Sequence, residues 1–136
     1  MNKNLSVSDV ASWLDGYKEA WETLDPEKAA SLFVEDALYR DEPYAEPHKG
    51  REGVRDYWTN VTSDQKDVTF TYEVLAVTDN TGIAHWHSEF SSRSSDAEIT
   101  LDGIFVLEFS ENRLVRNLKE WWHIKVESES GAEFDH

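Results

Sequence analysis

Three side chains of this sequence are candidates for acid–base chemistry. Tyr17 lies on an apolar stripe at helical spacing, Asp41 ends a short run with strand-like alternation, and Glu120 alternates with apolar residues in a later run. Burial raises the pKa of a carboxyl group, which suits such a group to general acid or base work near neutrality. A buried tyrosine hydroxyl needs a polar partner, and a ligand oxygen can be that partner. Asp41 and Glu120 could thus form a coupled pair, one acid and one base.

Each of these residues also has a purely structural interpretation. Asp41 begins the stretch Asp41-Glu42-Pro43, so it could open a turn and face water or cap a backbone group. Tyr17 could be a core tyrosine bonded to another side chain. Glu120 could orient its neighbours through hydrogen bonds to a Trp N–H or Tyr O–H group, since an unpaired buried carboxylate is costly.

Two histidines form a second candidate group, away from these three residues. His85 and His87 flank a tryptophan, so the two imidazoles share one face of a strand, where Glu89 or His123 could add metal ligands. The inward residues of that strand are apolar, namely Ala84, Trp86 and Phe90. This leaves the histidines on the outer face of the sheet. There, Glu98, Thr100 and Asp102 of the following strand could meet them. We expect no metal site.

Helical periodicity dominates the first half of the chain. A first helix is predicted after Ser8 as N-cap, with buried Val10, Trp13, Leu14, Tyr17 and Trp21. Asp25 caps a second helix whose first residue is Pro26, and the two helices form a hairpin. A third helix follows Gly50, with its apolar residues again at helical spacing: Val54, Tyr57, Trp58 and Val61.

Alternation of period two dominates the second half. A short strand is predicted over 37–41 and four long antiparallel strands over 68–78, 83–91, 99–109 and 114–126. The fold class is therefore α+β, with a curved sheet that must curl over the helices and leave a hollow at its mouth. Residues 1–126 form a single domain, and 127–136 form an acidic tail for which we expect disorder.

Composition excludes several partners. The 136 residues carry a formal net charge of −15, which disfavours nucleic acids and anionic membranes as partners. The chain has no cysteine, no phosphate-binding glycine loop and no nucleophile elbow, so no cofactor is expected.

No stretch is long and apolar enough to span a bilayer, and the N-terminal residues do not form a signal peptide, so a cytoplasmic protein is expected. Six tryptophans indicate a large aromatic core, interface or cavity wall.

Four stretches carry a resemblance to a known group of proteins. They are Phe33-Val-Glu-Asp-Ala-Leu-Tyr-Arg-Asp41, Gly50-Arg-Glu-Gly-Val-Arg-Asp-Tyr-Trp58, Leu101-Asp-Gly-Ile-Phe-Val-Leu-Glu-Phe109 and Lys119-Glu-Trp-Trp-His123. In this order the chain resembles the SnoaL-like branch of the nuclear transport factor 2-like superfamily over about 7–126. The resemblance implies a cone-shaped, cystatin-like sheet with Tyr39 and Asp41 facing inward, and a homodimer through the outer sheet face. The superfamily contains isomerases, dehydratases, cyclases, epoxide hydrolases and non-catalytic binders.

Δ5-3-ketosteroid isomerase offers a sharper comparison within this superfamily. Its helix-one tyrosine, strand aspartate and third-helix aromatic residue look aligned to Tyr17, Asp41 and Trp58. In that enzyme the aspartate shuttles a proton, while the tyrosine and a second, protonated aspartic acid hold the developing oxyanion. That second acid falls at Phe105 here, so half of the oxyanion hole is missing.

Two functional hypotheses follow. The first is a cofactor-independent isomerase, dehydratase or cyclase that acts on a small apolar carbonyl or hydroxyl compound. Asp41, Tyr17 and Glu120 would do the chemistry, and an aromatic wall would hold the ligand: Trp21, Tyr39, Trp58, Trp86, Phe105 and Trp122. The second hypothesis is a ligand-binding or oligomerisation module that uses the same pocket without chemistry.

Overall fold

Polar caps fix where the helices begin in the computed structural model, which describes residues 4–127 and 133–135. Helix α1 (Val7–Glu22) starts after Ser6, whose hydroxyl accepts from the Asp9 N–H at 3.0 Å while the Asp9 carboxylate accepts from the Ser6 N–H at 3.0 Å. The predicted cap, Ser8, was wrong because only Ser6 has an acidic residue three positions later to complete this reciprocal capping box. The cap predicted for α2 (Pro26–Ser31) is confirmed, since Asp25 accepts from the Lys28 N–H at 3.1 Å.

The remaining elements follow the predicted order. They are β1 (Phe33–Arg40), β2 (His48–Lys49), α3 (Gly50–Thr62), β3 (Gln65–Thr78), β4 (Thr81–Ser92), β5 (Glu98–Phe109), β6 (Val115–Glu127) and β7 (Glu133–Asp135). The short strand β2 was not predicted. Within the predicted acidic tail, Glu127 ends β6 and 133–135 pair with β6 as β7, and the other tail residues lie outside the described residues.

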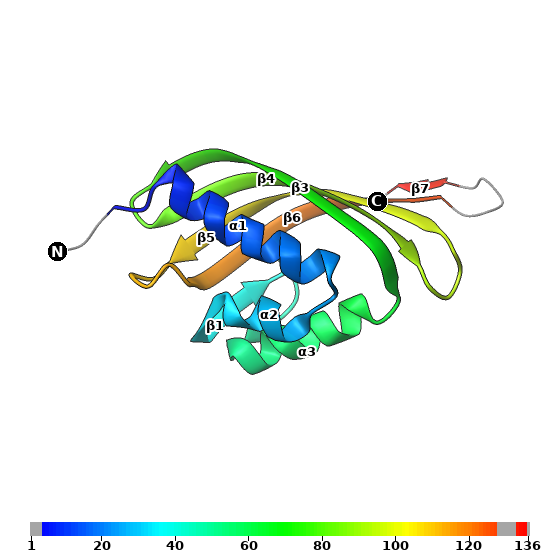
Figure 1. Cartoon of the computed structure of the whole chain (residues 1–136), viewed down its shortest axis with the longest axis horizontal. Coiled ribbons are helices and arrows are strands. Elements are labelled where there is room, and N and C mark those ends of the chain that lie inside the picture. Colours follow the sequence, from blue (N-terminus) through cyan, green and yellow to red (C-terminus); the bar gives the residue numbers. More distant parts are fainter. Residues whose placement is uncertain (1–3, 128–132, 136) are drawn as a thin grey trace.

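One curved sheet carries the fold. Six strands run in the order β2-β1-β6-β5-β4-β3, and β7 pairs with β6. Strands β3 to β6 form an antiparallel meander, while β1 lies parallel to β6. Figure 1 shows the long strands curving over α1, with α2 and α3 on the same side of the sheet. The predicted α+β class is confirmed. None of the helices in the described part of the chain could cross a membrane.

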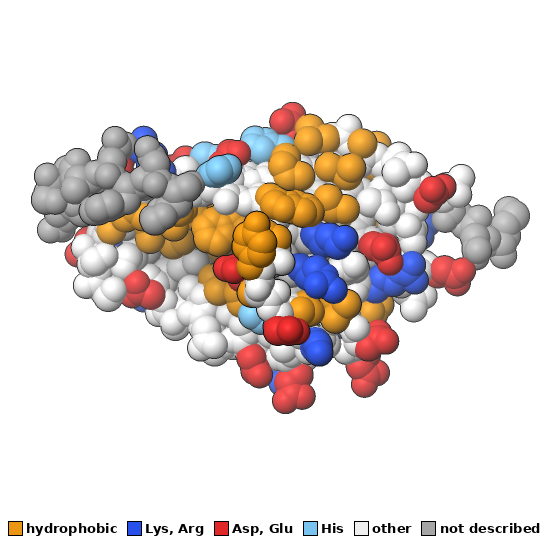
Figure 2. All heavy atoms as spheres, turned by 180° about the vertical axis from the view of Figure 1, so that it is seen from behind, with side chains coloured by type: hydrophobic (Ala, Val, Ile, Leu, Met, Phe, Trp, Pro, Cys, Tyr) orange, Lys and Arg blue, Asp and Glu red, His pale blue; other side chains and the backbone are white. Residues whose placement is uncertain are grey.

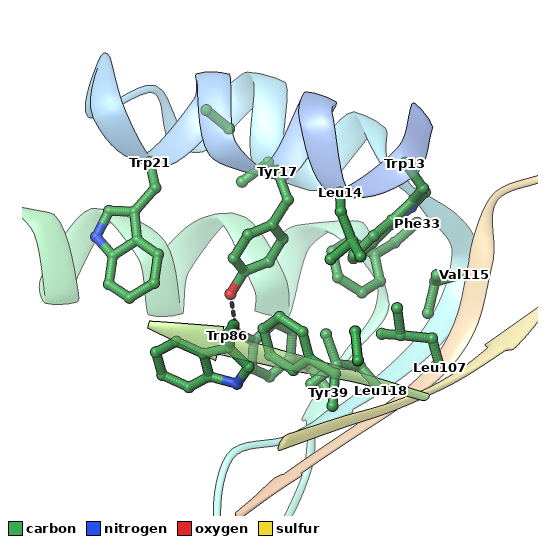
Figure 3. Packing of buried hydrophobic residues seen from close by; sticks show 14 of the residues in the cluster. Trp13, Leu14, Tyr17, Trp21, Phe33, Tyr39, Trp86, Leu107, Val115 and Leu118 are labelled. Atoms are coloured by element: carbon green, nitrogen blue, oxygen red, sulfur yellow. Dashed lines mark hydrogen bonds between the residues drawn. The ribbon is translucent and has the colours of Figure 1, made fainter. Parts of the chain in front are cut away.

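Aromatic side chains fill the space between the sheet and α1. Trp13, Tyr17 and Trp21 point from α1 toward the concave face, where Tyr39 and Trp86 meet them (Figure 3). Trp86 lies nearly parallel to Phe105, with ring centroids 5.2 Å apart. This position depends on Gly103, because a Cβ there would come within 2.8 Å of Trp86 Cζ2 and 2.6 Å of the Trp121 carbonyl oxygen. The glycine lets a large ring lie flat across the middle of β5.

Candidate active site

A cavity of about 320 Å³ lies between the helices α1 and α3 and the curved sheet. It brings together residues from α1, α3 and five strands, with Asp41 just after β1, and it includes all three predicted catalytic residues. Its lining consists of Tyr17, Trp21, Tyr39, Asp41, Tyr57, Trp58, Val61, Gln65, Trp86, Phe90, Ile99, Leu101, Glu120, Trp122 and Ile124. Of the six predicted ligand-binding residues, only Phe105 is not among them. It is fully buried, packs against Trp86 and Tyr17, and so supports the wall from beneath.

A chain of hydroxyl groups leads from α1 to β6. The hydroxyl oxygens of Tyr17 and Tyr39 are 2.8 Å apart (dashed line in Figure 3), and Tyr39 in turn hydrogen-bonds the Glu120 carboxyl group. Both tyrosines are almost completely buried. Burial raises the pKa of each phenol, and the proximity of Glu120 raises it further. The two hydroxyls therefore keep their protons and act as neutral hydrogen-bonding groups.

Glu120 is the most unusual titratable residue of the site. Its residue surface is 7% exposed, and burial raises the pKa of its carboxyl group well above the usual value. The charge of Asp41 raises this pKa further, and the hydrogen bond from Tyr39 lowers it in part. The oxygen Oε2 is buried without a hydrogen-bond partner among the described residues. A carboxyl group in this environment holds its proton, and it has an oxygen to spare for a ligand.

Asp41 lies where β1 ends, on the wall of the same cavity. Its side chain is 20% exposed, and its Oδ1 is 3.3 Å from His48 Nε2. The Tyr57 hydroxyl also hydrogen-bonds this carboxylate. The Asp41 carbonyl oxygen accepts a 2.8 Å hydrogen bond from Trp122 Nε1, which fixes the backbone at this point. Asp41 is therefore both a turn residue and a pocket residue, so the two interpretations of its sequence position do not exclude each other.

Three residues of the site were missed or undervalued by sequence reasoning, two beside Asp41 and one in the cavity wall. Tyr57 was predicted only as an apolar residue of the third helix, yet its hydroxyl faces Asp41, and burial raises the pKa of this phenol. His48 approaches Asp41 because β2 pairs it with Tyr39, and its ring packs on Tyr57 with centroids 4.2 Å apart. Gln65 accepts a 2.8 Å hydrogen bond from Trp21 Nε1. A buried glutamine beside an indole gives no periodic signal that a sequence could reveal.

The aromatic rings of the wall meet at steep angles. Trp21 and Trp58 are 5.7 Å apart at 76°, Tyr17 and Trp58 are 5.2 Å apart at 83°, and Trp21 and Trp86 are 5.8 Å apart at 56°. Rings in this arrangement present faces in several directions around one volume. Trp58 Nε1 and Trp86 Nε1 are buried and lack a hydrogen-bond partner among the described residues. The wall is therefore apolar but contains unused polar atoms.

The histidine pair lies on the opposite face of the sheet, as predicted. His85 Nε2 is 2.8 Å from Asp102 Oδ1, and His87 Nδ1 is 3.0 Å from Asp102 Oδ2. His87 also contacts Glu89 at 3.0 Å, and the hydrogen bonds to Glu89 and Asp102 raise the pKa of this histidine. Among the described residues, no group of three or more His, Asp or Glu side chains is placed to hold a metal ion.

Comparisons with solved structures show the same fold in proteins of low sequence identity. A provisionally named isomerase from Bacillus subtilis matches with a TM-score of 0.73 and 16% identity, over 85% of this chain and 86% of that chain. A hypothetical protein of ketosteroid isomerase-like fold from Catenulispora acidiphila, in complex with trimethylamine, matches with a TM-score of 0.70 and 13% identity, over 80% and 83%. The epoxide hydrolase/cyclase-like enzyme SalBIII, which has a role in pyran ring formation in salinomycin, matches with a TM-score of 0.72 and 17% identity, over 85% and 91%.

The sequence itself matches a family model. The model of the SnoaL-like domain covers residues 14–117, which include Tyr17 and Asp41 and stop short of Glu120. No functionally curated protein matches the sequence. Because the family match spans more than half of the chain and agrees with the fold, this chain belongs to the SnoaL-like domain family.

Proposed function

We propose that this chain is a cofactor-independent enzyme that moves a proton on a small, largely apolar compound carrying a carbonyl or hydroxyl group. One observation carries the proposal: two carboxyl groups with different environments share an aromatic cavity. Glu120 is buried and holds its proton, whereas Asp41 is partly exposed and contacts His48. Two titratable groups whose environments separate their protonation states are the usual basis for an acid and a base in one site.

The two groups would act in concert on the substrate. Asp41 would take a proton from the carbon beside a carbonyl group, and the C–H electrons would form a C=C bond as the carbonyl oxygen gains a proton from Glu120. In each outcome Glu120 would take back the proton of the enol oxygen as the carbonyl group re-forms. Asp41 would return its proton to the γ-carbon of a β,γ-unsaturated ketone (isomerisation) or to a β-hydroxyl group that leaves as water (dehydration). In a cyclisation the enol carbon would bond to a second carbonyl carbon of the same molecule, and the oxygen of that carbonyl would take the proton from Asp41 and become a hydroxyl group. Isomerisation, dehydration and cyclisation all share this first step. The tyrosine hydroxyls would hold the carboxyl groups in position.

Glu120 could also replace the second acid of the oxyanion hole, which is missing here. The ketosteroid isomerase comparison placed that acid at Phe105, and Phe105 is paired directly with Glu120 across β5 and β6. A protonated carboxyl group on the neighbouring strand could donate to a developing oxyanion from a similar part of the cavity. Support from the isomerase and cyclase-like structures is limited to the shared fold, because both are under 25% identical.

A test compares Asp41→Asn with the wild type on a panel of enones, hydroxy ketones and steroids. We expect ligand binding, followed by tryptophan fluorescence, to change little, while turnover of any accepted compound falls by about 100-fold or more. Glu42→Gln is a matched control, since it removes the neighbouring carboxylate, which does not line this cavity. Equal turnover by wild type and Asp41→Asn would remove Asp41 from the mechanism.

One observation favours the second candidate, a binding module without chemistry. The Tyr17 hydroxyl, which would face the substrate oxygen in an isomerase, is already bonded to Tyr39. If panel compounds bind the wild type but none is converted, the binding module becomes the better description.

We also propose that the chain forms a homodimer through the outer face of the sheet. Figure 2 shows hydrophobic side chains across this face, and Trp121 and Leu75 are 50% and 52% exposed. Trp121→Glu should convert a dimer into a monomer in analytical ultracentrifugation, whereas the loop variant Tyr44→Glu should not. A monomeric wild type at micromolar concentration would contradict the proposal.

A further inference from the structure

The cavity combines aromatic faces with a carboxylate. Eight of its fifteen lining side chains are aromatic, its two acidic residues are Asp41 and the buried, protonated Glu120, and no Lys, Arg or His is among the described residues that line it. We propose that the cavity binds a small organic cation, an alkylated ammonium group on a compound that also carries a hydroxyl or carbonyl oxygen. This inference concerns the same cavity as the proposed function and deepens it by naming the ligand class.

The aromatic wall suits an ammonium group. A cation is attracted to the face of an indole or phenol ring within about 6 Å, and several faces around one volume form the cage that recognises methylated ammonium groups. Trp21, Trp58 and Trp86 all line the cavity, and the ring of Trp21 meets that of Trp58 at 76° and that of Trp86 at 56°. Such rings bind methyl groups by apolar contact and the positive charge by their electron-rich faces.

The carboxylate of Asp41 supplies the opposite charge. Its contacts within the described chain are the imidazole of His48 and the hydroxyl of Tyr57, so neither Lys nor Arg neutralises it. A carboxylate beside an apolar cavity interacts more strongly with a cation than it would in water, because the effective dielectric constant is lower. The same charge opposes the entry of carboxylates and phosphates.

Glu120 provides the oxygen partner. The residue is more than nine-tenths buried, it lines the cavity, and its Oε2 has no hydrogen-bond partner in the described part of the chain. A protonated carboxyl group can both donate to and accept from a hydroxyl group. A compound with an ammonium group toward the rings and an oxygen toward Glu120 would therefore use both unmatched features of the site.

The experiment compares choline with 3,3-dimethylbutan-1-ol, which has the same shape and hydroxyl group but a neutral carbon in place of nitrogen. Binding is measured by calorimetry and tryptophan fluorescence at about 0.15 M salt, which screens the surface charge, and about pH 8, where an ordinary histidine is neutral. We expect choline to bind the wild type at least about tenfold more tightly than the alcohol. In Asp41→Asn this preference should fall to about threefold or less.

Two further variants separate the cavity from the surface. Glu120→Gln should keep the preference, because burial raises the pKa of Glu120 and so favours its neutral form, and Glu111→Gln should keep it because Glu111 lies in a turn outside the cavity lining. Equal binding of the two ligands, or no binding of choline, would overturn the inference. If Glu111→Gln lowers the choline preference as much as Asp41→Asn does, the preference comes from the overall charge of the protein. That result would also overturn the inference. If neutral compounds are turned over in an Asp41-dependent way but choline is not preferred, the further inference fails and the proposed function stands. If choline binds with the expected preference but no compound is turned over, the proposed enzymatic activity fails and the inference about the ligand class stands.

Discussion

Replacement of Glu120 by glutamine tests the electrostatics of the site without any knowledge of a substrate. The carboxyl group is buried and its pKa is raised well above the usual value for glutamic acid, near 4.5, first by burial and then by the charge of Asp41. Between the ordinary pKa and the folded pKa, the unfolded chain releases this proton and the folded chain keeps it. Stability must therefore fall as the pH rises through that interval.

The size of the effect follows from one proton. The folded state binds one more proton than the unfolded state in this interval, so the free energy of unfolding decreases by about 1.4 kcal/mol per pH unit. The stabilisation is fully present below about pH 4.5, and its loss is complete once the pH has passed the folded pKa. Glutamine has no proton to exchange. The stability of Glu120→Gln minus that of the wild type should thus increase with pH at this slope and then level off at the folded pKa.

Urea denaturation at a series of pH values measures this difference. The range should begin above about pH 5.5, because the isoelectric point near 4.5 invites precipitation. His87, whose pKa is also raised, and the general repulsion of an acidic chain contribute to both proteins and cancel in the difference. Asp41→Asn removes the charge that is the second cause of the raised Glu120 pKa. When Glu120→Gln is compared with its parent in the Asp41→Asn background, the stability difference should therefore level off at a lower pH. A difference curve that is flat from about pH 5.5 to 9 would refute our account of Glu120 as a buried acid.

Three further substitutions test the packing around the site by urea denaturation. Gly103→Ala should lower the free energy of unfolding by at least about 2 kcal/mol, because its Cβ would meet Trp86 and the Trp121 backbone; a change near zero would contradict this packing. Ser6→Ala should cost about 1 kcal/mol and Ser8→Ala much less, and the reverse order would return the N-cap to Ser8. Tyr39→Phe should cost about 1–3 kcal/mol, since it removes the hydroxyl between Tyr17 and Glu120; an unchanged midpoint would show that this hydrogen-bond chain adds no stability.

Local signals explain why most of the fold could be predicted. Asp25 and Pro26 specify a helix start by themselves, because one caps the first turn and the other has no N–H to leave unpaired. Alternation with turn residues between the runs likewise defined β3 to β6 to within a few residues. The first N-cap was misplaced because Ser6 and Ser8 both precede apolar residues, and the choice depends on the side chain of Asp9.

The site was predictable only in part, because its residues meet through tertiary pairing. Tyr39, Asp41 and Glu120 could be placed by alternation and resemblance, and the structure brings them to one cavity. His48 could not be placed, because Pro43 and Pro47 predict a loop and the strand β2, which pairs His48 with Tyr39, is only two residues long. Phe105 was assigned to the wall because alternation gives the face of a residue, but not whether a larger neighbour such as Trp86 covers it.

The indole N–H groups explain how so many large rings can leave a cavity instead of filling it. Trp13 donates to the Leu32 carbonyl oxygen, Trp21 to Gln65 and Trp122 to the Asp41 carbonyl oxygen, each at 2.8 Å. These bonds join α1 to the end of α2, α1 to β3, and β6 to the end of β1, so each ring is fixed at its edge. Trp21 and Trp122 line the cavity, so these bonds restrain two of its four indoles from turning into the space beside the carboxyl groups, whereas Trp13 supports α1 from outside the lining. Trp58 and Trp86 have no such bond among the described residues, and they are positioned by ring packing against Trp21 instead.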